Sequence, residues 1–105
     1  MDLITIIIST YKGENGIVEC VQSALSQDYE NYEVIVVDDN GKGTVSQKGT
    51  EQLLNKFKSN SRFKYIAHEK NINGSAARNT GIRNAKGTYL AFLDDDDVLT
   101  PDSIR

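Results

Sequence analysis

The chain has 105 residues, 38% of them hydrophobic and 26% charged, a composition typical of one globular domain with its own core. Its formal net charge of −3 argues against a general nucleic-acid-binding protein, because such proteins need a surplus of lysine and arginine to displace counterions from phosphates. The single cysteine excludes an internal disulfide, and the longest apolar run, within residues 3–8, is far too short to cross a bilayer.

Short apolar runs alternate with helical patterns along the chain. Residues 3–9, LITIIIS, are apolar enough to predict a strand that is buried on both faces. A helix is expected over residues 16–27, where Ile17, Val21 and Leu25 recur at the spacing of one helix face. The elements expected next are a strand over residues 32–39, a helix within 44–61, a strand over 62–68, a helix from the cap Asn73 to Gly87 and a strand over 88–95.

The last residues, TPDSIR, resemble the beginning of another helix. Thr100 is a suitable N-cap, Pro101 fits the first helical position, and Asp102 is favourable beside the positive end of a helix dipole. A helix that short is not stable alone, so we expect the natural polypeptide to continue.

Strands that alternate with helices predict an α/β fold of the Rossmann-like kind, with a mostly parallel sheet and helices on both faces. The carboxyl ends of parallel strands share one edge of the sheet, and open α/β sheets bind ligands at that edge. The polar residues expected there are Ser9, Thr10, Tyr11, Asp38, Asp39, Asp94, Asp95, Asp96 and Asp97.

The four consecutive aspartates, Asp94 to Asp97, indicate a metal site. Two carboxylates about 4 Å apart repel each other by about 4 kcal/mol at an effective dielectric of about 20, and a divalent cation removes that cost. Mg²⁺ and Mn²⁺ prefer oxygen ligands of this kind. Alternation along an extended segment points Asp94 and Asp96 to one side and Asp95 and Asp97 to the other. The alternative is a solvated loop that caps the next helix.

The other polar residues of this edge fit a nucleotide. Asp39 can accept hydrogen bonds from a ribose hydroxyl or a base N–H, with Asp38 in a supporting role, although DDNGKG also has the composition of a turn. Arg78 either contacts the ligand or forms a salt bridge with the edge aspartates. Tyr11 either stacks on a nucleobase or packs against the following loop.

Two further residues have no functional role in this interpretation. Cys20 lies on the apolar flank of the first helix and is expected to be a core thiol. His68 has no second histidine and no Ser or Cys partner in a known motif, so we expect a surface residue. The turn after the first strand, STYKGENG, has no G-x-G-x-x-G fingerprint, which argues against a Rossmann-like dehydrogenase or methyltransferase.

Taken in order, TIIISTYKG, SALSQDYENYEVIVVDDNG, NINGSAARNTGIRNAKGTYLAFLDDDD and TPD resemble the N-terminal half of family 2 glycosyltransferases with the GT-A fold. The resemblance covers nearly all of residues 1–105. It implies that the chain is the nucleotide-sugar-binding part of such a domain, truncated before the acceptor-binding part. The stretch GKGTVSQKG departs from the short Ser-Thr-Asp turn that is more common in the family, which puts the outer wall of the nucleotide site in doubt.

The resemblance also implies roles for individual residues. Ser9, Thr10 and Tyr11 would surround the base, Asp39 would contact the uracil or the ribose, and Arg78 would lie nearby. Asp94 and Asp96 match the ends of the family's D-x-D motif, with Asp95 between them, and Mg²⁺ or Mn²⁺ would join that motif to the diphosphate.

The implied activity is inverting transfer of a sugar from a nucleotide-diphosphate donor, expected to be UDP-linked, to a glycan, lipid-linked or other hydroxyl acceptor. The catalytic base would lie beyond Arg105, so a non-catalytic nucleotide-binding domain or an inactive fragment is the alternative. The N-terminus lacks the basic region and cleavage site of a signal peptide, so the cytoplasm is expected. Peripheral association of a longer protein with the inner face of the plasma membrane is left open.

Overall fold

A computed structural model describes residues 2–104, and it confirms the α/β fold. Within these residues the sheet has four strands, all parallel, in the order β3-β2-β1-β4. The elements in chain order are β1 (Ile4–Thr10), α1 (Ile17–Ala24), β2 (Tyr32–Asp38), α2 (Val45–Leu54), the 3₁₀ helix η1 (Asn55–Phe57), β3 (Phe63–Ala67), α3 (Gly74–Asn84) and β4 (Tyr89–Asp94).

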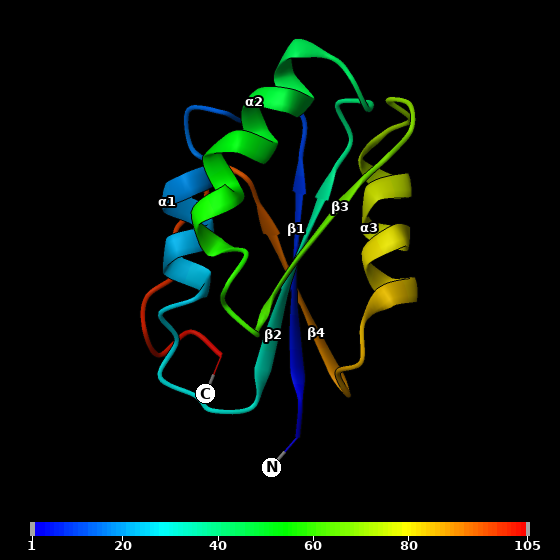
Figure 1. The fold of residues 1–105 in the computed structure, drawn as a ribbon. Coiled ribbons are helices and arrows are strands. Elements are labelled where there is room, and N and C mark those ends of the chain that lie inside the picture. The colour runs from blue at the N-terminus through cyan, green and yellow to red at the C-terminus, as the bar shows by residue number, and fades with distance from the viewer. Residues whose placement is uncertain (1, 105) are drawn as a thin grey trace.

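The helices cover both faces of the sheet, as the alternation of elements predicts (Figure 1). α1 and α2 lie on one face and α3 on the other, so that β1 and β2 are enclosed between two helical layers. Every residue of β2 is buried, which explains why this strand is apolar without alternation. The two central strands therefore place the residues at their carboxyl ends between the two helical layers.

Each face of the sheet has its own apolar cluster. On the α1 and α2 face, Ile6, Ile8, Val34 and Val36 pack with α1 residues that include Cys20. On the α3 face, Ile35 and Val37 pack with Ala77, while Gly81 of α3 lies against Ile7. Cys20 is fully buried, so its prediction as a core thiol is confirmed.

The two ends of the sheet differ in chemistry. At the amino end, the buried Glu33 carboxylate accepts hydrogen bonds from Thr5 Oγ1 at 2.7 Å and from the Lys86 backbone N–H at 2.8 Å. Lys64 Nζ lies 3.4 Å from the same carboxylate. This end is therefore closed by internal bonds, whereas the carboxyl end carries the polar residues discussed below.

The C-terminal segment differs from the sequence prediction. Residues 101–104 form turns, and the helix expected from Thr100 is wrong for the described residues. Thr100 Oγ1 donates to Asp102 at 2.8 Å, and the segment packs along the end of α1, where Leu99 N donates to Ser23 Oγ at 3.0 Å. The Thr100 hydroxyl is thus occupied locally, and Thr100 does not cap a helix.

Over residues 2–104, no helix combines the length and the apolar character that crossing a membrane requires.

Candidate functional site

The carboxyl ends of β1 and β4 and the start of α3 enclose a cleft of about 330 Å³. Parallel pairing brings these segments together, since Ser9 is paired with Asp94 and Thr10 with Asp38 in the register of the sheet. The cleft is lined by Ser9, Thr10, Tyr11, Asp39, Gly74, Ala77, Arg78, Asp94, Asp95 and Asp96. Of the residues expected at this edge, all except Asp38 and Asp97 therefore line one cleft, as does Arg78.

Asp39 is the most firmly held carboxylate of the cleft and is only 3% exposed. Its Oδ1 accepts a hydrogen bond from the Ile72 backbone N–H at 3.0 Å and lies 2.8 Å from His68 Nδ1. Its Oδ2 accepts from Asn71 Nδ2 at 2.9 Å. The backbone N–H of Asp39 donates to Thr10 O at 2.9 Å, which fixes the residue against the end of β1.

Asp38 is also buried, but its bonds are internal and it does not line the cleft. Its Oδ1 accepts from the Asn40 backbone N–H at 2.9 Å and from Asn40 Nδ2 at 2.7 Å. Its Oδ2 accepts from the Tyr65 hydroxyl at 2.6 Å. Burial and this carboxylate raise the pKa of Tyr65, so the phenol remains a donor. The geometry supports a supporting role for Asp38, which shapes the turn after β2.

Asp95 is turned toward β1. Thr10 Oγ1 donates to Asp95 Oδ2 at 2.8 Å, and the Tyr11 backbone N–H lies 3.3 Å from the same oxygen. Gly13 lies against this pair, since a Cβ there would be 2.1 Å from Asp95 Oδ2 and 2.6 Å from Thr10 Oγ1. The loop after β1 thus needs a glycine at this position for the bond to form.

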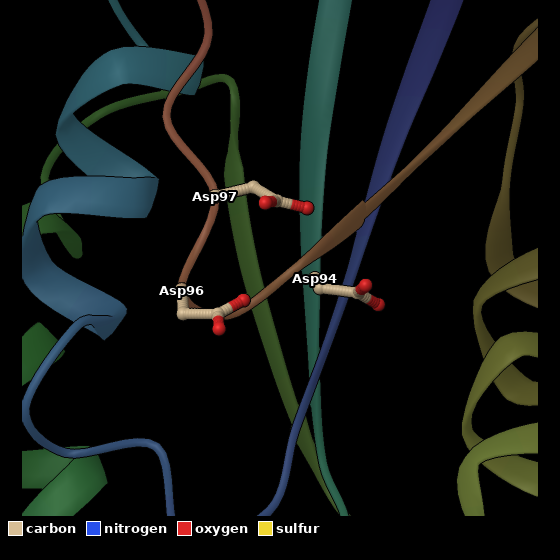
Figure 2. Close-up of side chains that lie close together, drawn as sticks. All are labelled: Asp94, Asp96 and Asp97. Atoms are coloured by element: carbon tan, nitrogen blue, oxygen red, sulfur yellow. The ribbon is translucent and has the colours of Figure 1, made fainter.

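Asp94, Asp96 and Asp97 form a carboxylate cluster at and just after the end of β4 (Figure 2), and the first two also line the cleft. One oxygen from each lies within 4.8 Å of the others, and all three side chains are exposed. We expected Asp97 to face the opposite side from Asp94 and Asp96, and this was wrong. β4 ends at Asp94, and the chain then turns, with the Asp97 backbone N–H donating to Asp94 O at 3.0 Å, so that strand alternation no longer applies.

The charges of this acidic segment affect the pKa of the buried Cys20 thiol. Its Sγ donates to Asp94 O at 3.3 Å. Burial raises the pKa of Cys20 to about 12, and the charges of Asp95, Asp97, Asp96 and Asp94 raise it in the same direction. The thiol therefore stays protonated at neutral pH, and the region is one in which added positive charge is favourable.

Arg78 and Tyr11 supply the exposed part of the lining. Within residues 2–104 Arg78 takes part in no ion pair, so the alternative of a salt bridge with the edge aspartates is not supported. The Tyr11 ring is 49% exposed, and Lys12 Nζ lies 5.3 Å from its centroid. Both residues are exposed and line the cleft, so a ligand can reach them.

His68 is not a surface residue, contrary to the prediction from sequence. Its side chain is 10% exposed and lies between Asp39 and Thr80, with Nε2 2.7 Å from Thr80 Oγ1. The prediction considered only a second histidine and Ser or Cys partners in a known motif, whereas the partners of His68 are Thr80 and Asp39, the latter 29 residues away. Asn71, which bonds to Asp39, was also not identified from the sequence. The only feature of the sequence that pointed to Asn71 is its position in the loop between a strand end and the cap of α3.

Comparisons with known proteins identify the family. Residues 5–105 match the model of Glycosyl transferase family 2, and the chain belongs to this family. WfaP of Escherichia coli, named UDP-Glc:alpha-D-GlcNAc-diphosphoundecaprenol beta-1,3-glucosyltransferase, is 41% identical over 97 residues, which are 92% of this chain and 36% of that protein. The chain matches the N-terminal part of such relatives and spans between 13% and 40% of their lengths.

Solved structures show the same fold. TarS 1-349 of Staphylococcus aureus in complex with UDP has a TM-score of 0.83 and 30% identity, over 99% of this chain and 30% of that one. The mannosyltransferase PcManGT of Pyrobaculum calidifontis, in complex with GDP-Man and Mn²⁺, has a TM-score of 0.76, with 90% of this chain and 28% of that one covered. Its identity of 23% supports likeness of fold alone. The expectation of a GT-A fold is confirmed.

Proposed function

We propose that this chain is the donor-binding part of an inverting, metal-dependent glycosyltransferase that takes its sugar from a UDP-linked donor. The observation that carries the proposal is the single cleft in which a buried acceptor, Asp39, faces the same space as the exposed aspartates. A nucleoside diphosphate has a base with N–H donors at one end and a diphosphate that binds hard cations at the other. The two ends of the cleft match these two ends of the ligand.

The base end of the cleft is built for recognition through hydrogen bonds and stacking. Asp39 is held by Ile72, Asn71 and His68 and can accept a bond from the base or the ribose. The exposed Tyr11 ring offers a surface for stacking on the base. Ser9 and Thr10 line the same cleft. These residues would position the donor before any chemistry takes place.

The residues at the other end fit a divalent cation. Asp94 and Asp96, joined by Asp97, offer carboxylate oxygens, which are the ligands that Mg²⁺ and Mn²⁺ prefer. A bound cation would supply positive charge that stabilises the departing nucleoside diphosphate. Arg78 lines the same cleft and can balance further phosphate charge. Asp95 would keep the segment in place through its bond with Thr10.

The proposal also covers the acceptor and the cellular location. We place the catalytic base, an Asp or Glu that deprotonates the acceptor hydroxyl, beyond Arg105. The name of the Escherichia coli relative includes a lipid diphosphate acceptor, which supports a glycan or lipid-linked acceptor here. Such an acceptor would favour a cytoplasmic protein that associates peripherally with the inner face of the plasma membrane.

Calorimetric titration of UDP in the presence and absence of Mn²⁺ tests the proposal. We expect Mn²⁺ to tighten UDP binding by at least about tenfold, and Asp96→Asn to remove most of that gain. Asp102→Asn is the matched control, because it removes the same charge from an exposed residue outside the cluster. Equal binding with and without Mn²⁺ would contradict the metal dependence. Metal-dependent binding without transfer by the longer protein would favour a non-catalytic nucleotide-binding domain.

A further inference from the structure

His68 lies behind Asp39, between the carboxyl end of β3 and α3. Its Nδ1 is 2.8 Å from Asp39 Oδ1 and its Nε2 is 2.7 Å from Thr80 Oγ1. Because the side chain is 10% exposed and that of Asp39 is 4% exposed, water competes little for this contact. His68 does not line the cleft, so any role in binding is exerted through Asp39.

The hydrogen-bond inventory fixes the role of Nδ1. A carboxylate can only accept, and Asp39 already accepts from the backbone N–H of Ile72 and the side-chain amide of Asn71. Nδ1 of His68 must therefore carry a hydrogen and donate it to Oδ1. The Thr80 hydroxyl also lies 3.0 Å from Ala76 O, and Nε2 can bond to this hydroxyl as donor or as acceptor. The Thr80 contact holds the ring orientation in either case.

Asp39 is then left with few free hydrogen-bond acceptor positions, and their direction is fixed. The two oxygens of a carboxylate offer about four acceptor positions. His68 and Ile72 occupy Oδ1, and Asn71 occupies one position of Oδ2. Within the described residues one acceptor position is left, on Oδ2, and Asp39 lines the cleft. A terminal carboxylate torsion is otherwise broad, so these three donors decide where that position points.

We propose that His68 is a positioning residue that sets the base selectivity of the cleft, an inference that rests on the proposed binding of a uridine nucleotide. Uracil presents an N–H donor at N3, whereas cytosine presents an acceptor at the same atom. A carboxylate held with one free acceptor position accepts the former and repels the latter. Without its bond from His68, Asp39 turns more freely and distinguishes the two bases less well.

The test compares UDP with CDP, which share the ribose and the diphosphate, by titration in the presence of Mn²⁺. For His68→Ala we expect UDP affinity to fall about tenfold and CDP affinity to change less than about twofold. His68→Asn retains a donor near the position of Nδ1 and should keep most of the UDP preference. His68→Gln carries its amide near the position of Nε2 instead and should behave like His68→Ala. Thermal unfolding of each variant establishes that it is folded.

Three results would overturn the inference. His68→Ala could weaken UDP and CDP equally, which indicates a structural role alone. His68→Asn could be no better than His68→Gln, which shows that a donor at Nδ1 is not what matters. Unchanged binding of both nucleotides by His68→Ala would also remove the inference while leaving the proposed function intact. Failure of the unaltered chain to bind UDP with Mn²⁺ would instead remove the proposed function, and the inference with it.

Discussion

A single hydrogen bond from Thr10 orients Asp95 away from its three acidic neighbours. The Thr10 side chain is 1% exposed, and its hydroxyl donates to Asp95 Oδ2 at 2.8 Å. The bond turns one carboxylate toward β1, so that Asp94, Asp96 and Asp97 form the open cluster. Order in this segment thus depends on a polar group buried at the end of β1.

Replacement of Thr10 by valine tests this bond. Thr10→Val keeps the shape of the side chain but leaves Asp95 without the hydroxyl donor, and we expect the free energy of unfolding to fall by about 1–2 kcal/mol. Thr88→Val is the control, since Thr88 is exposed, and it should change that free energy by less than about 0.5 kcal/mol. Urea denaturation measures both. Equal effects of the two substitutions would contradict the importance of the Thr10 bond.

Single residues also show how far sequence could predict the site. Asp39, Arg78, Asp94 and Asp96 were predicted to share the cleft because strand ends and helix starts converge in any parallel sheet. The position of Asp97 depends on a turn that begins where β4 ends, and strand periodicity cannot locate that residue. The burial of His68 depends on contacts with Asp39 and Thr80, which only the folded chain brings together.

At the scale of elements, two helical glycines should respond in opposite ways to replacement by alanine, because the space beside them differs. Gly49 lies in α2, where an added Cβ would be 3.9 Å from its nearest neighbour, Glu14 Cγ. Gly81 lies in α3, where the same Cβ would be 2.5 Å from Ile7 Cγ2. Alanine is favoured over glycine inside a helix by about 1 kcal/mol, whereas overpacking a core costs about 1–3 kcal/mol. Because α3 packs closely against β1 at Gly81, we expect the cost of overpacking there to exceed the gain in helix propensity, so that alanine lowers the free energy of unfolding.

We predict that Gly49→Ala raises the free energy of unfolding by about 0.5–1 kcal/mol and that Gly81→Ala lowers it by about 1–2 kcal/mol. Urea denaturation of the two variants provides the measurement, and each is the control for the other because the chemical change is the same. A stabilising Gly81→Ala would show that α3 does not pack as closely on Ile7 as described.

Elements were predicted well where the pattern was strong and less well at their ends. β1 and β2 follow from β-branched runs, β3 and β4 follow from short runs with aromatic and aliphatic residues, and the N-cap of α3 follows from Asn73, whose Oδ1 accepts from Ala76 N at 2.8 Å. α3 ends at Asn84, before the predicted Gly87, because the chain must turn there to enter β4. The end of a helix depends on the next element and not on its own residues alone.

The stability of the whole molecule should depend on pH through Glu33. Burial alone would raise the pKa of this carboxyl, but the Lys86 N–H, the Thr5 hydroxyl and the charge of Lys64 together lower it below the ordinary value of 4.5. Folding therefore favours the ionised form. This contribution is fully present above pH 4.5 and is lost as the pH falls through the lowered pKa.

We expect the free energy of unfolding to fall more steeply between pH 5 and pH 3 in the unaltered chain than in Glu33→Gln, because the latter has no such carboxyl to protonate. Glu51→Gln is the control, since Glu51 is exposed on α2, and it should retain the original pH dependence. Urea denaturation at several pH values provides the data. A Glu33→Gln variant with unchanged pH dependence would contradict the role of this buried carboxylate.

We propose that the cluster of Asp94, Asp96 and Asp97 holds the divalent cation on which UDP binding depends. The most direct test is an anomalous difference map from crystals of the chain grown with Mn²⁺ and UDP. We predict a manganese peak within coordination distance of Asp94 and Asp96, next to the diphosphate. A well-ordered UDP with no manganese beside these carboxylates would contradict the claim.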